Sequence, residues 1–124
     1  MANKYNRQDI LYVNCPDELD NYVKLKTIFD AVCSVYGYKP ESFIDTALQE
    51  TKVRSARRVF SYIGSSCGLT LTEMAAYINL SKERMSIWQS EFEHWVLERN
   101  DRFEGYMKTI TEVQRRFNKI RAGE

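Results

Sequence analysis

Apolar residues recur at steps of three and four along nearly the whole 124-residue chain, and this spacing constrains the fold more than any other feature. Side chains at that spacing share one face of an α-helix, whereas a strand would alternate them. The longest run spans residues 18–36, with Asp17 as a start signal and Gly37 as a left-handed stop. The sequence therefore predicts an all-α fold.

The chain length and the number of helical segments indicate one domain. Domains of about 100–150 residues are the most frequent, and two independent cores would need a longer chain. After the first helix, helical spacing continues in five further segments, at about 39–47, 52–67, 70–78, 81–95 and 101–121. We therefore expect a single helical domain of five to six helices over residues 17–124, preceded by an N-terminal arm over residues 1–16.

Residues that catalysis or metal binding would require are sparse. Cys15, Cys33 and Cys67 are widely separated and form no Cys-x-x-Cys pair, and His94 is the single histidine. We expect the cysteines to be buried free thiols. Because no paired catalytic groups are present, we expect no enzyme activity, no metal, no cofactor and no small-molecule substrate.

The sequence indicates neither a membrane span nor a secretory signal. The longest uncharged run, residues 59–72, contains several hydroxyl residues and two glycines, which excludes a bilayer-spanning helix. The opening residues Met-Ala-Asn-Lys-Tyr do not lead into the apolar segment of a secretory signal. We therefore expect a cytoplasmic protein.

The segment at about residues 70–98 has the residue spacing of a helix-turn-helix, two short helices joined by a tight turn. The small side chain of Ala75 fits where two helices cross closely, and Asn79 tolerates the positive φ that the turn needs. Met85 and Trp88 would anchor the second helix in the core. The alternative is a pair of ordinary packed helices joined by a short turn.

The second helix of this motif would turn a largely polar side outward. Its outward-facing residues are Ser81, Lys82, Glu83, Arg84, Ser86 and Ile87. Such a helix fits the major groove of double-stranded DNA, with its N-terminal residues against base edges. We expect Lys82, Arg84 and Ser86 to read bases. Ser81 and Thr70 would contact phosphates through their hydroxyls or through helix-end amides.

The stretch 51–72 is basic, although the whole chain has a net charge of only +1. It contains Lys52, Arg54, Arg57 and Arg58 and no acidic residue. A local patch can bind a polyanion, because screening limits its field to about 8–10 Å. We expect Lys52, Arg54 and Arg57 to contact phosphates or the minor groove. Arg58 would join them or face the opposite side of the helix, and a merely solvated helix face is the alternative for all four.

Three segments carry a family resemblance: residues 28–37 (IFDAVCSVYG), 52–57 (KVRSAR) and 69–75 (LTLTEMA). In this order they resemble the opening helix, the Val-x-Arg-x-Arg basic segment and the Leu-Ser-Leu-Pro-Glu-Ile-Gly segment of the C-terminal DNA-binding domain (domain IV) of the bacterial chromosomal replication initiator DnaA. The likeness covers about residues 22–96. It implies a Trp-repressor-like helical fold that binds double-stranded DNA, with the basic segment gripping phosphate and minor groove.

The chain departs from this family at two points. Residues 79–86 read Asn-Leu-Ser-Lys-Glu-Arg-Met-Ser where the family has Gly-Gly-Arg-Asp-His-Ser/Thr-Thr-Val, so the family's base readers are absent. The phosphate-binding Gly-x-x-x-x-Gly-Lys-Ser/Thr loop is also absent, so we expect no ATPase part. We therefore expect a stand-alone, sequence-specific reader of double-stranded DNA with a regulatory or replication-associated role.

Two alternatives stay open at this point. The first is a helical protein–protein adaptor that has lost DNA binding. The second concerns the last helix, where Arg115, Arg116, Lys119 and Arg121 could form a solvated end that complements the helix dipole, or a second basic surface. The apolar residues of that helix could also form the seam of a homodimer, since many helix-turn-helix proteins read paired half-sites.

Overall fold

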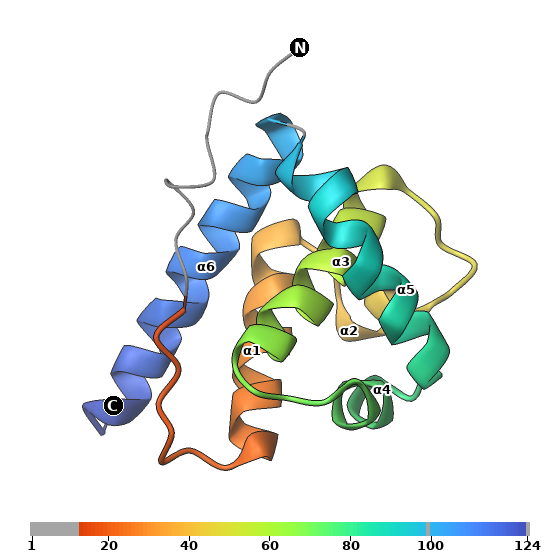
Figure 1. Ribbon diagram of the computed structural model, residues 1–124. Helices are drawn as coiled ribbons and strands as arrows, with labels where there is room; N and C mark the ends of the chain where they lie inside the picture. The colour runs from red at the N-terminus through yellow and green to blue at the C-terminus, as the bar shows by residue number, and fades with distance from the viewer. Residues whose placement is uncertain (1–12, 99, 124) are drawn as a thin grey trace.

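The computed structural model describes residues 13–98 and 100–123, and these residues form six α-helices and no strand (Figure 1). The helices are α1 (Asn21–Tyr36), α2 (Pro40–Ile44), α3 (Thr51–Ser66), α4 (Leu71–Ile78), α5 (Lys82–Phe92) and α6 (Asn100–Arg121). A π-helical segment, Glu93–Leu97, continues α5 toward α6. Over the described residues, the prediction of an all-α single domain is confirmed.

Helices α1 and α3 pack against each other at the centre of the fold (Figure 1). The long α6 packs along α1 on one side, and α5 packs on α3 on the other. Buried rings fill the space between these helices, among them Phe29, Phe43 and Phe60, whose centroids lie 5.1, 5.7 and 5.8 Å apart in edge-to-face pairs. Such pairs stabilise a core beyond the area they bury, so α3 and α5 stand on a well-packed base.

Local capping residues fix most helix ends. Helix α1 begins at Asn21, later than the predicted residue 18, because the Asp20 carboxylate accepts a hydrogen bond from the Val23 N–H at 2.9 Å. Gly37 ends this helix with φ 76°, as predicted. Helix α2 ends at Ile44, earlier than predicted, where the chain turns extended.

The apolar side of α6 is buried within this chain, against α1 and the π-helical segment. Its core residues are Phe103, Tyr106, Ile110, Val113 and Phe117. These side chains are therefore not exposed for the dimer seam that the sequence suggested, whereas Ile120 near the end of α6 is exposed. A homodimer through the exposed part of α6 stays a prediction.

The described end of the predicted N-terminal arm lies against α6. The Asn14 N–H donates to Gln114 Oε1 at 2.6 Å, and Gln114 Nε2 donates to the Asn14 carbonyl at 3.3 Å. Residues 1–12 of the predicted arm lie outside the described residues. The arm residues that are described thus extend the packing of α6.

The cysteines are free thiols, and two of them are buried as predicted. These are Cys33 and Cys67, while Cys15 is half-buried. Desolvation raises the pKa of Cys33 to about 12, which keeps this thiol protonated at neutral pH. Within the part of the chain that the structure describes, no helix is long and apolar enough to cross a membrane. In the same residues, no three His, Cys, Asp or Glu side chains gather as a metal site would require.

Candidate nucleic-acid interface

Helices α4 and α5 are joined by a tight turn whose geometry follows from local sequence. Thr70 begins α4 with a reciprocal capping box: its Oγ1 accepts from the Glu73 N–H at 3.0 Å, and Glu73 Oε1 accepts from the Thr70 N–H at 3.0 Å. Asn79 ends α4 in the left-handed conformation predicted for it, with φ 58°. The Leu80 N–H then donates to the Ala75 carbonyl at 2.9 Å. These hydrogen bonds fix the orientation of α5 relative to α4.

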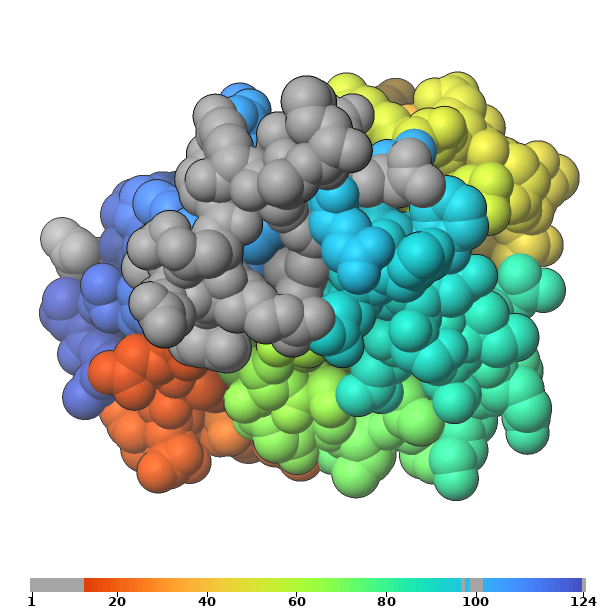
Figure 2. Space-filling model, turned by 45° about the horizontal axis from the view of Figure 1, so that its top comes forward, coloured from red at the N-terminus to blue at the C-terminus, as the bar shows by residue number. Residues whose placement is uncertain are grey.

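Helix α5 presents the outward side that the sequence predicted. Ser81 caps the helix, with its Oγ accepting from the Arg84 N–H at 3.1 Å, while Met85 and Trp88 are buried on the inner side. The exposed outward residues are Ser81, Lys82, Glu83, Arg84, Ser86 and Ile87. Figure 2 shows α5, in teal, at the surface beside the yellow segment that leads from α2 into α3.

The first turn of α3 holds Lys52 and Arg54 at the surface. Both side chains are exposed, and neither forms an ion pair with any residue that the structure describes. The Lys52 ammonium lies 5.8 Å from the centre of the Tyr38 ring, within cation–π range. Arg54 lines a cleft together with Arg84 of α5. Two predicted contacts from separate helices therefore lie on one surface.

The second turn of α3 corrects the sequence analysis, because Arg57 is buried with 3% of its surface exposed. Its guanidinium donates to the backbone carbonyls of Phe43, Asp45 and Leu48 at 2.8, 2.7 and 2.8 Å. Burial lowers the pKa of Arg57, and the positive charge of Arg84 lowers it further. Arg57 therefore holds the loop between α2 and α3 and is not free to serve as the predicted phosphate or minor-groove contact.

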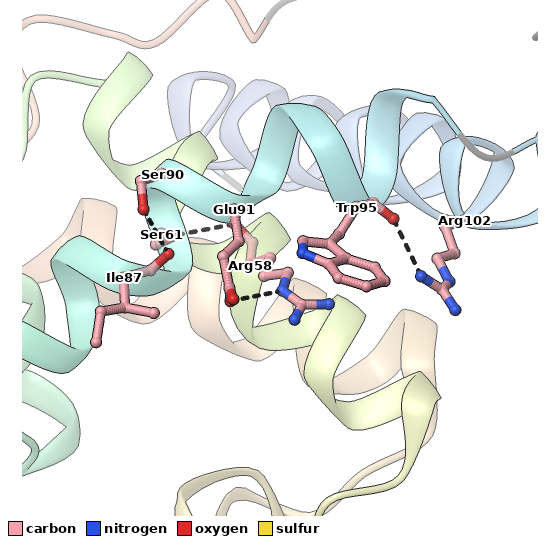
Figure 3. A network of polar contacts seen from close by, with 7 residues as sticks. All are labelled: Arg58, Ser61, Ile87, Ser90, Glu91, Trp95 and Arg102. Atoms are coloured by element: carbon pink, nitrogen blue, oxygen red, sulfur yellow. Dashed lines mark hydrogen bonds and ion pairs between the residues drawn. The ribbon is translucent and has the colours of Figure 1, made fainter.

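Arg58 is also buried, with 3% of its surface exposed, so like Arg57 it does not lie at the surface as the predicted DNA contact would. Its Nε donates to Glu91 Oε1 of α5 at 3.1 Å (Figure 3). Its guanidinium carbon lies 5.2 Å from the centre of the Trp95 ring, and that of Arg102 lies 5.8 Å from the same ring. Figure 3 shows the indole between the two guanidinium groups. Arg58 thus ties α3 to α5 and to the π-helical segment.

A cleft of about 190 Å³ opens between α3 and α5, and we call it the arginine cleft. Its charged lining residues are Arg54, Arg57, Arg58, Arg84 and Glu91. Arg57 and Arg58 form a buried wall, whereas Arg54 and Arg84 reach the cleft from exposed positions on two helices. Ile87 supplies an apolar edge. Four guanidinium groups therefore share this cleft with one carboxylate.

The structure does not bring every predicted residue to this cleft. Thr70 lies at the start of α4, where its capping partner Glu73 also accepts a hydrogen bond from Asn21 Nδ2 of α1 at 2.5 Å. The backbone N–H of Thr70 lowers the pKa of Glu73 most, followed by Asn21. A phosphate bound at Thr70 would therefore be a contact separate from the arginine cleft.

Sequence reasoning missed two charged residues beside the cleft. Glu91 pairs with Arg58 across 33 positions of sequence, and Arg102 of α6 meets the Trp95 ring from its other side. A smaller pocket of about 30 Å³ is lined by Arg54, Arg58 and Arg102, so positive charge continues along α3 toward α6. These partners are distant in sequence, and no local spacing signals them.

Four exposed cations of this surface have no carboxylate partner among the described residues, whereas Arg115 and Arg116 of α6 share one. We define the α3–α5 face as the exposed side chains of the first turn of α3 and of the outward side of α5. Its cations that pair with no described carboxylate are Lys52, Arg54, Lys82 and Arg84. Glu83 is the acidic residue of the same face. On α6, by contrast, Arg115 and Arg116 both pair with Glu112 at 2.6 Å.

Comparisons with known proteins give the α3–α5 face no established ligand. The chain matches no family model, and no curated protein or solved structure is significantly similar to it. A function for this face must therefore follow from its own charges and geometry. Those properties favour a polyanion, because guanidinium and ammonium groups without carboxylate partners bind phosphate oxygens well.

Proposed function

We propose that the protein binds double-stranded DNA sequence-specifically, with α4 and α5 acting as a helix-turn-helix. Helix α5 would enter the major groove, and the first turn of α3 would contact the phosphate backbone. The observation that carries this proposal is the set of four exposed cations without carboxylate partners on the α3–α5 face. Backbone phosphates would neutralise these charges and release counterions, which favours binding.

The dimensions and exposed side of α5 support groove binding. An α-helix with its side chains is about 10–12 Å across, and the major groove is about 12 Å wide. Lys82, Arg84 and Ser86 are the proposed base readers, since all three are exposed on the outward side. Arg84 bound bidentately to a guanine would add about 1–3 kcal/mol of discrimination. Ile87, 55% exposed, offers an apolar contact of the kind that suits a thymine methyl group.

The proposed phosphate contacts are fewer than the sequence alone suggested. Lys52 and Arg54 keep that role because both are exposed at the start of α3. Ser81 keeps it as the exposed residue at the start of α5, where helix-end amides also favour an anion. Thr70 keeps it through its exposed hydroxyl alone, because the Glu73 carboxylate already accepts from the Thr70 N–H at the start of α4. The two buried arginines of α3 support the surface from below and leave the list of DNA contacts.

The resemblance to the C-terminal domain of DnaA is consistent with this proposal, and the comparisons with known proteins add no support to it. A Trp-repressor-like arrangement of the helix-turn-helix belongs to the same proposal. Because residues 79–86 lack the base readers of that family, we propose a stand-alone reader with a target sequence of its own. Its role would be regulatory or replication-associated.

The salt dependence of duplex binding tests the proposal. A fluorescein-labelled random-sequence duplex is titrated with the protein at several NaCl concentrations, and the anisotropy gives the dissociation constant. We expect about micromolar affinity at low salt, weakening steeply and linearly on a double-logarithmic plot. The double variant Lys52→Gln/Arg54→Gln should lower the slope by about two, since each phosphate contact contributes about 0.9.

A matched control separates location from total charge. The variant Arg115→Gln/Arg116→Gln removes two positive charges from α6 and should leave the slope nearly unchanged. Absence of wild-type binding at low salt, or equal losses in the two double variants, would contradict the proposal. The helical protein–protein adaptor would then be the better description. Selection of bound sequences from the random duplex pool tests the sequence-specific part.

A further inference from the structure

The arginine cleft concentrates positive charge that its own residues do not compensate. Its lining contains four guanidinium groups and the carboxylate of Glu91, which pairs with Arg58. At Arg57 burial lowers the pKa most and the charge of Arg84 lowers it next, while Asp45 and Tyr38 raise it and Arg54 lowers it by a smaller amount. The neighbouring arginines therefore repel the Arg57 guanidinium. A bound anion would relieve this repulsion, whereas a cation would add to it.

The buried wall of the cleft is fixed without any ligand. Arg57 is held by three backbone carbonyls, and Arg58 is held by Glu91 and by the Trp95 ring (Figure 3). The terminal nitrogens of Arg58 donate no hydrogen bond to the residues that the structure describes. Donors that are positioned in advance lose little conformational entropy when a ligand binds. The wall therefore offers preorganised positive charge.

The size and shape of the cleft suit a small oxyanion. Its volume of about 190 Å³ is several times the roughly 30 Å³ that a water molecule occupies in the liquid. Arg54 of α3 and Arg84 of α5 have no carboxylate partner among the described residues, so both can close on a ligand from two helices. Ile87 and Trp88 give one side an apolar surface, which strengthens charge-assisted hydrogen bonds nearby.

We propose that the arginine cleft binds a phosphate group, held between Arg54 and Arg84 above the buried Arg58. In this arrangement Arg84 contacts the phosphate and not a guanine, and Lys82 and Ser86 remain the base readers. The inference rests on the proposed function for the source of this group, which we take to be one backbone phosphodiester of double-stranded DNA. Because α3 and α5 both line the cleft, a phosphate bound there would set the position of α5 relative to the DNA backbone. The same guanidinium groups would donate to the oxygens of inorganic phosphate, which therefore serves as the probe.

The first arm of the test measures phosphate binding without DNA. The ¹⁵N-labelled protein is titrated with sodium phosphate and, separately, with sodium chloride at equal ionic strength, and NMR follows backbone amides and arginine Nε–H groups. We expect saturable shifts at the Arg58 Nε–H and at amides of α3 and α5, with a dissociation constant of about a millimolar. Chloride should give smaller shifts that do not saturate. Identical responses to the two salts would overturn the inference.

Charge variants then place the binding in the cleft. The variant Arg54→Gln/Arg84→Gln should weaken phosphate binding at least about fivefold, because two charge-assisted contacts are lost. Glu91→Gln should tighten it by about twofold, because a carboxylate no longer repels the anion. The control Lys108→Gln/Lys119→Gln removes two exposed charges of α6 and should change little. The same spectra show whether each variant is folded, and unchanged affinity in a folded Arg54→Gln/Arg84→Gln variant would overturn the inference.

The second arm uses a labelled duplex and distinguishes this inference from the proposed function. If the cleft holds a backbone phosphate, sodium phosphate should weaken duplex binding more than sodium chloride does at equal ionic strength. Duplex binding without this difference, and without phosphate shifts in the cleft, overturns the inference and leaves the proposed function standing. Phosphate binding without duplex binding supports the cleft as a phosphate site, but it overturns the part of the inference in which the bound phosphate belongs to double-stranded DNA.

Discussion

The start of α3 and the end of α6 are equally basic in sequence, yet their charges have different partners. Residues 52–58 and residues 115–121 each contain four basic side chains. At the end of α6, the Arg115 and Arg116 guanidinium groups both bind the Glu112 carboxylate at 2.6 Å. Within the helix, Glu112 therefore offsets one of the four positive charges, while Arg121 pairs with Glu18 at 3.3 Å and Lys119 pairs with no described carboxylate. The surface that this end of α6 forms attracts a polyanion less than its sequence suggests.

The four cations at the start of α3 divide in another way. Lys52 and Arg54 are exposed and have no described carboxylate partner, while Arg57 and Arg58 are buried. The comparison teaches that the number of basic residues in a segment does not determine its attraction for DNA. What matters is whether the fold supplies a partner for each charge, and this depends on residues elsewhere in the chain.

The largest expected effect is a loss of stability, and it distinguishes the buried arginines of α3 from the exposed one. Arg57→Met would leave the buried carbonyl of Phe43 and the part-buried carbonyls of Asp45 and Leu48 without their donor. We expect the free energy of unfolding to fall by about 2 kcal/mol, because an unpaired buried carbonyl costs about 1–3 kcal/mol and a part-buried one, which water can reach, costs less. Urea denaturation followed by circular dichroism measures this change.

Arg54→Met on the same helix is the matched control. Its side chain is exposed, so the free energy of unfolding should change by less than about 0.5 kcal/mol. Duplex affinity should show the opposite pattern from stability. Arg54→Met should weaken duplex binding even though the protein stays stable. Equal stability losses in the two variants would refute the assignment of Arg57 as a structural residue.

The parts of the fold that could be predicted from sequence are those that local interactions determine. The capping box of Thr70 and Glu73, the left-handed Asn79 and the Ser81 cap each involve residues within a few positions of one another. Their hydrogen bonds form inside one turn, so the sequence pattern contains both partners. The outward side of α5 followed directly, because Met85 and the residues at helical spacing from it face the core.

The arginine cleft could not be predicted for the opposite reason. The carbonyls that bind Arg57 lie 9 to 14 positions before it, at the end of α2 and in the following loop, and the sequence does not specify the path of that loop. Glu91 meets Arg58 across 33 positions. The sequence of a basic run on a helix is the same whether its side chains reach solvent or bind distant carbonyls and carboxylates. The burial of Arg57 and Arg58 therefore follows only from the packing of α3 against its neighbours.

A substitution with a smaller expected effect tests whether the relative position of the exposed charges matters for duplex binding, in addition to their lack of carboxylate partners. Asn79→Ala keeps every charge but places a less tolerant residue at φ 58°, where a left-handed conformation costs about 1 kcal/mol. We expect that loss in the free energy of unfolding. Duplex affinity should also weaken by about threefold, because the turn sets the position of Arg84 relative to Arg54.

Asn79→Gly provides the control, since glycine adopts the left-handed conformation without steric cost. Its stability and duplex affinity should stay close to those of the wild type. Urea denaturation and fluorescence anisotropy measure the two quantities on all three proteins. If Asn79→Ala lost stability but bound the duplex as tightly as Asn79→Gly, the geometry of the turn would be irrelevant to binding.

The smallest expected effect comes from removing the carboxylate that neutralises the end of α6. The hydrogen bond from Arg115, followed by that from Arg116, lowers the pKa of Glu112 from its usual 4.5 to about 2. Because the folded state has the lower pKa, the stabilisation is complete above about pH 4.5 and is lost as the pH falls through about 2. Allowing for solvent screening, we expect Glu112→Gln to cost about 1 kcal/mol at neutral pH.

Urea denaturation of both proteins across this pH range checks the sign. The difference in unfolding free energy should be constant above about pH 4.5 and shrink toward zero near pH 2, where the wild-type carboxyl is protonated. A difference independent of pH would mean that packing, and not charge, stabilises Glu112. At neutral pH the same variant frees Arg115 and Arg116, so non-specific duplex binding should tighten by about twofold. If duplex binding does not tighten, positive charge without a carboxylate partner is not sufficient for binding the duplex. The α3–α5 face must then bind DNA through the shape of its cleft and of α5 as well.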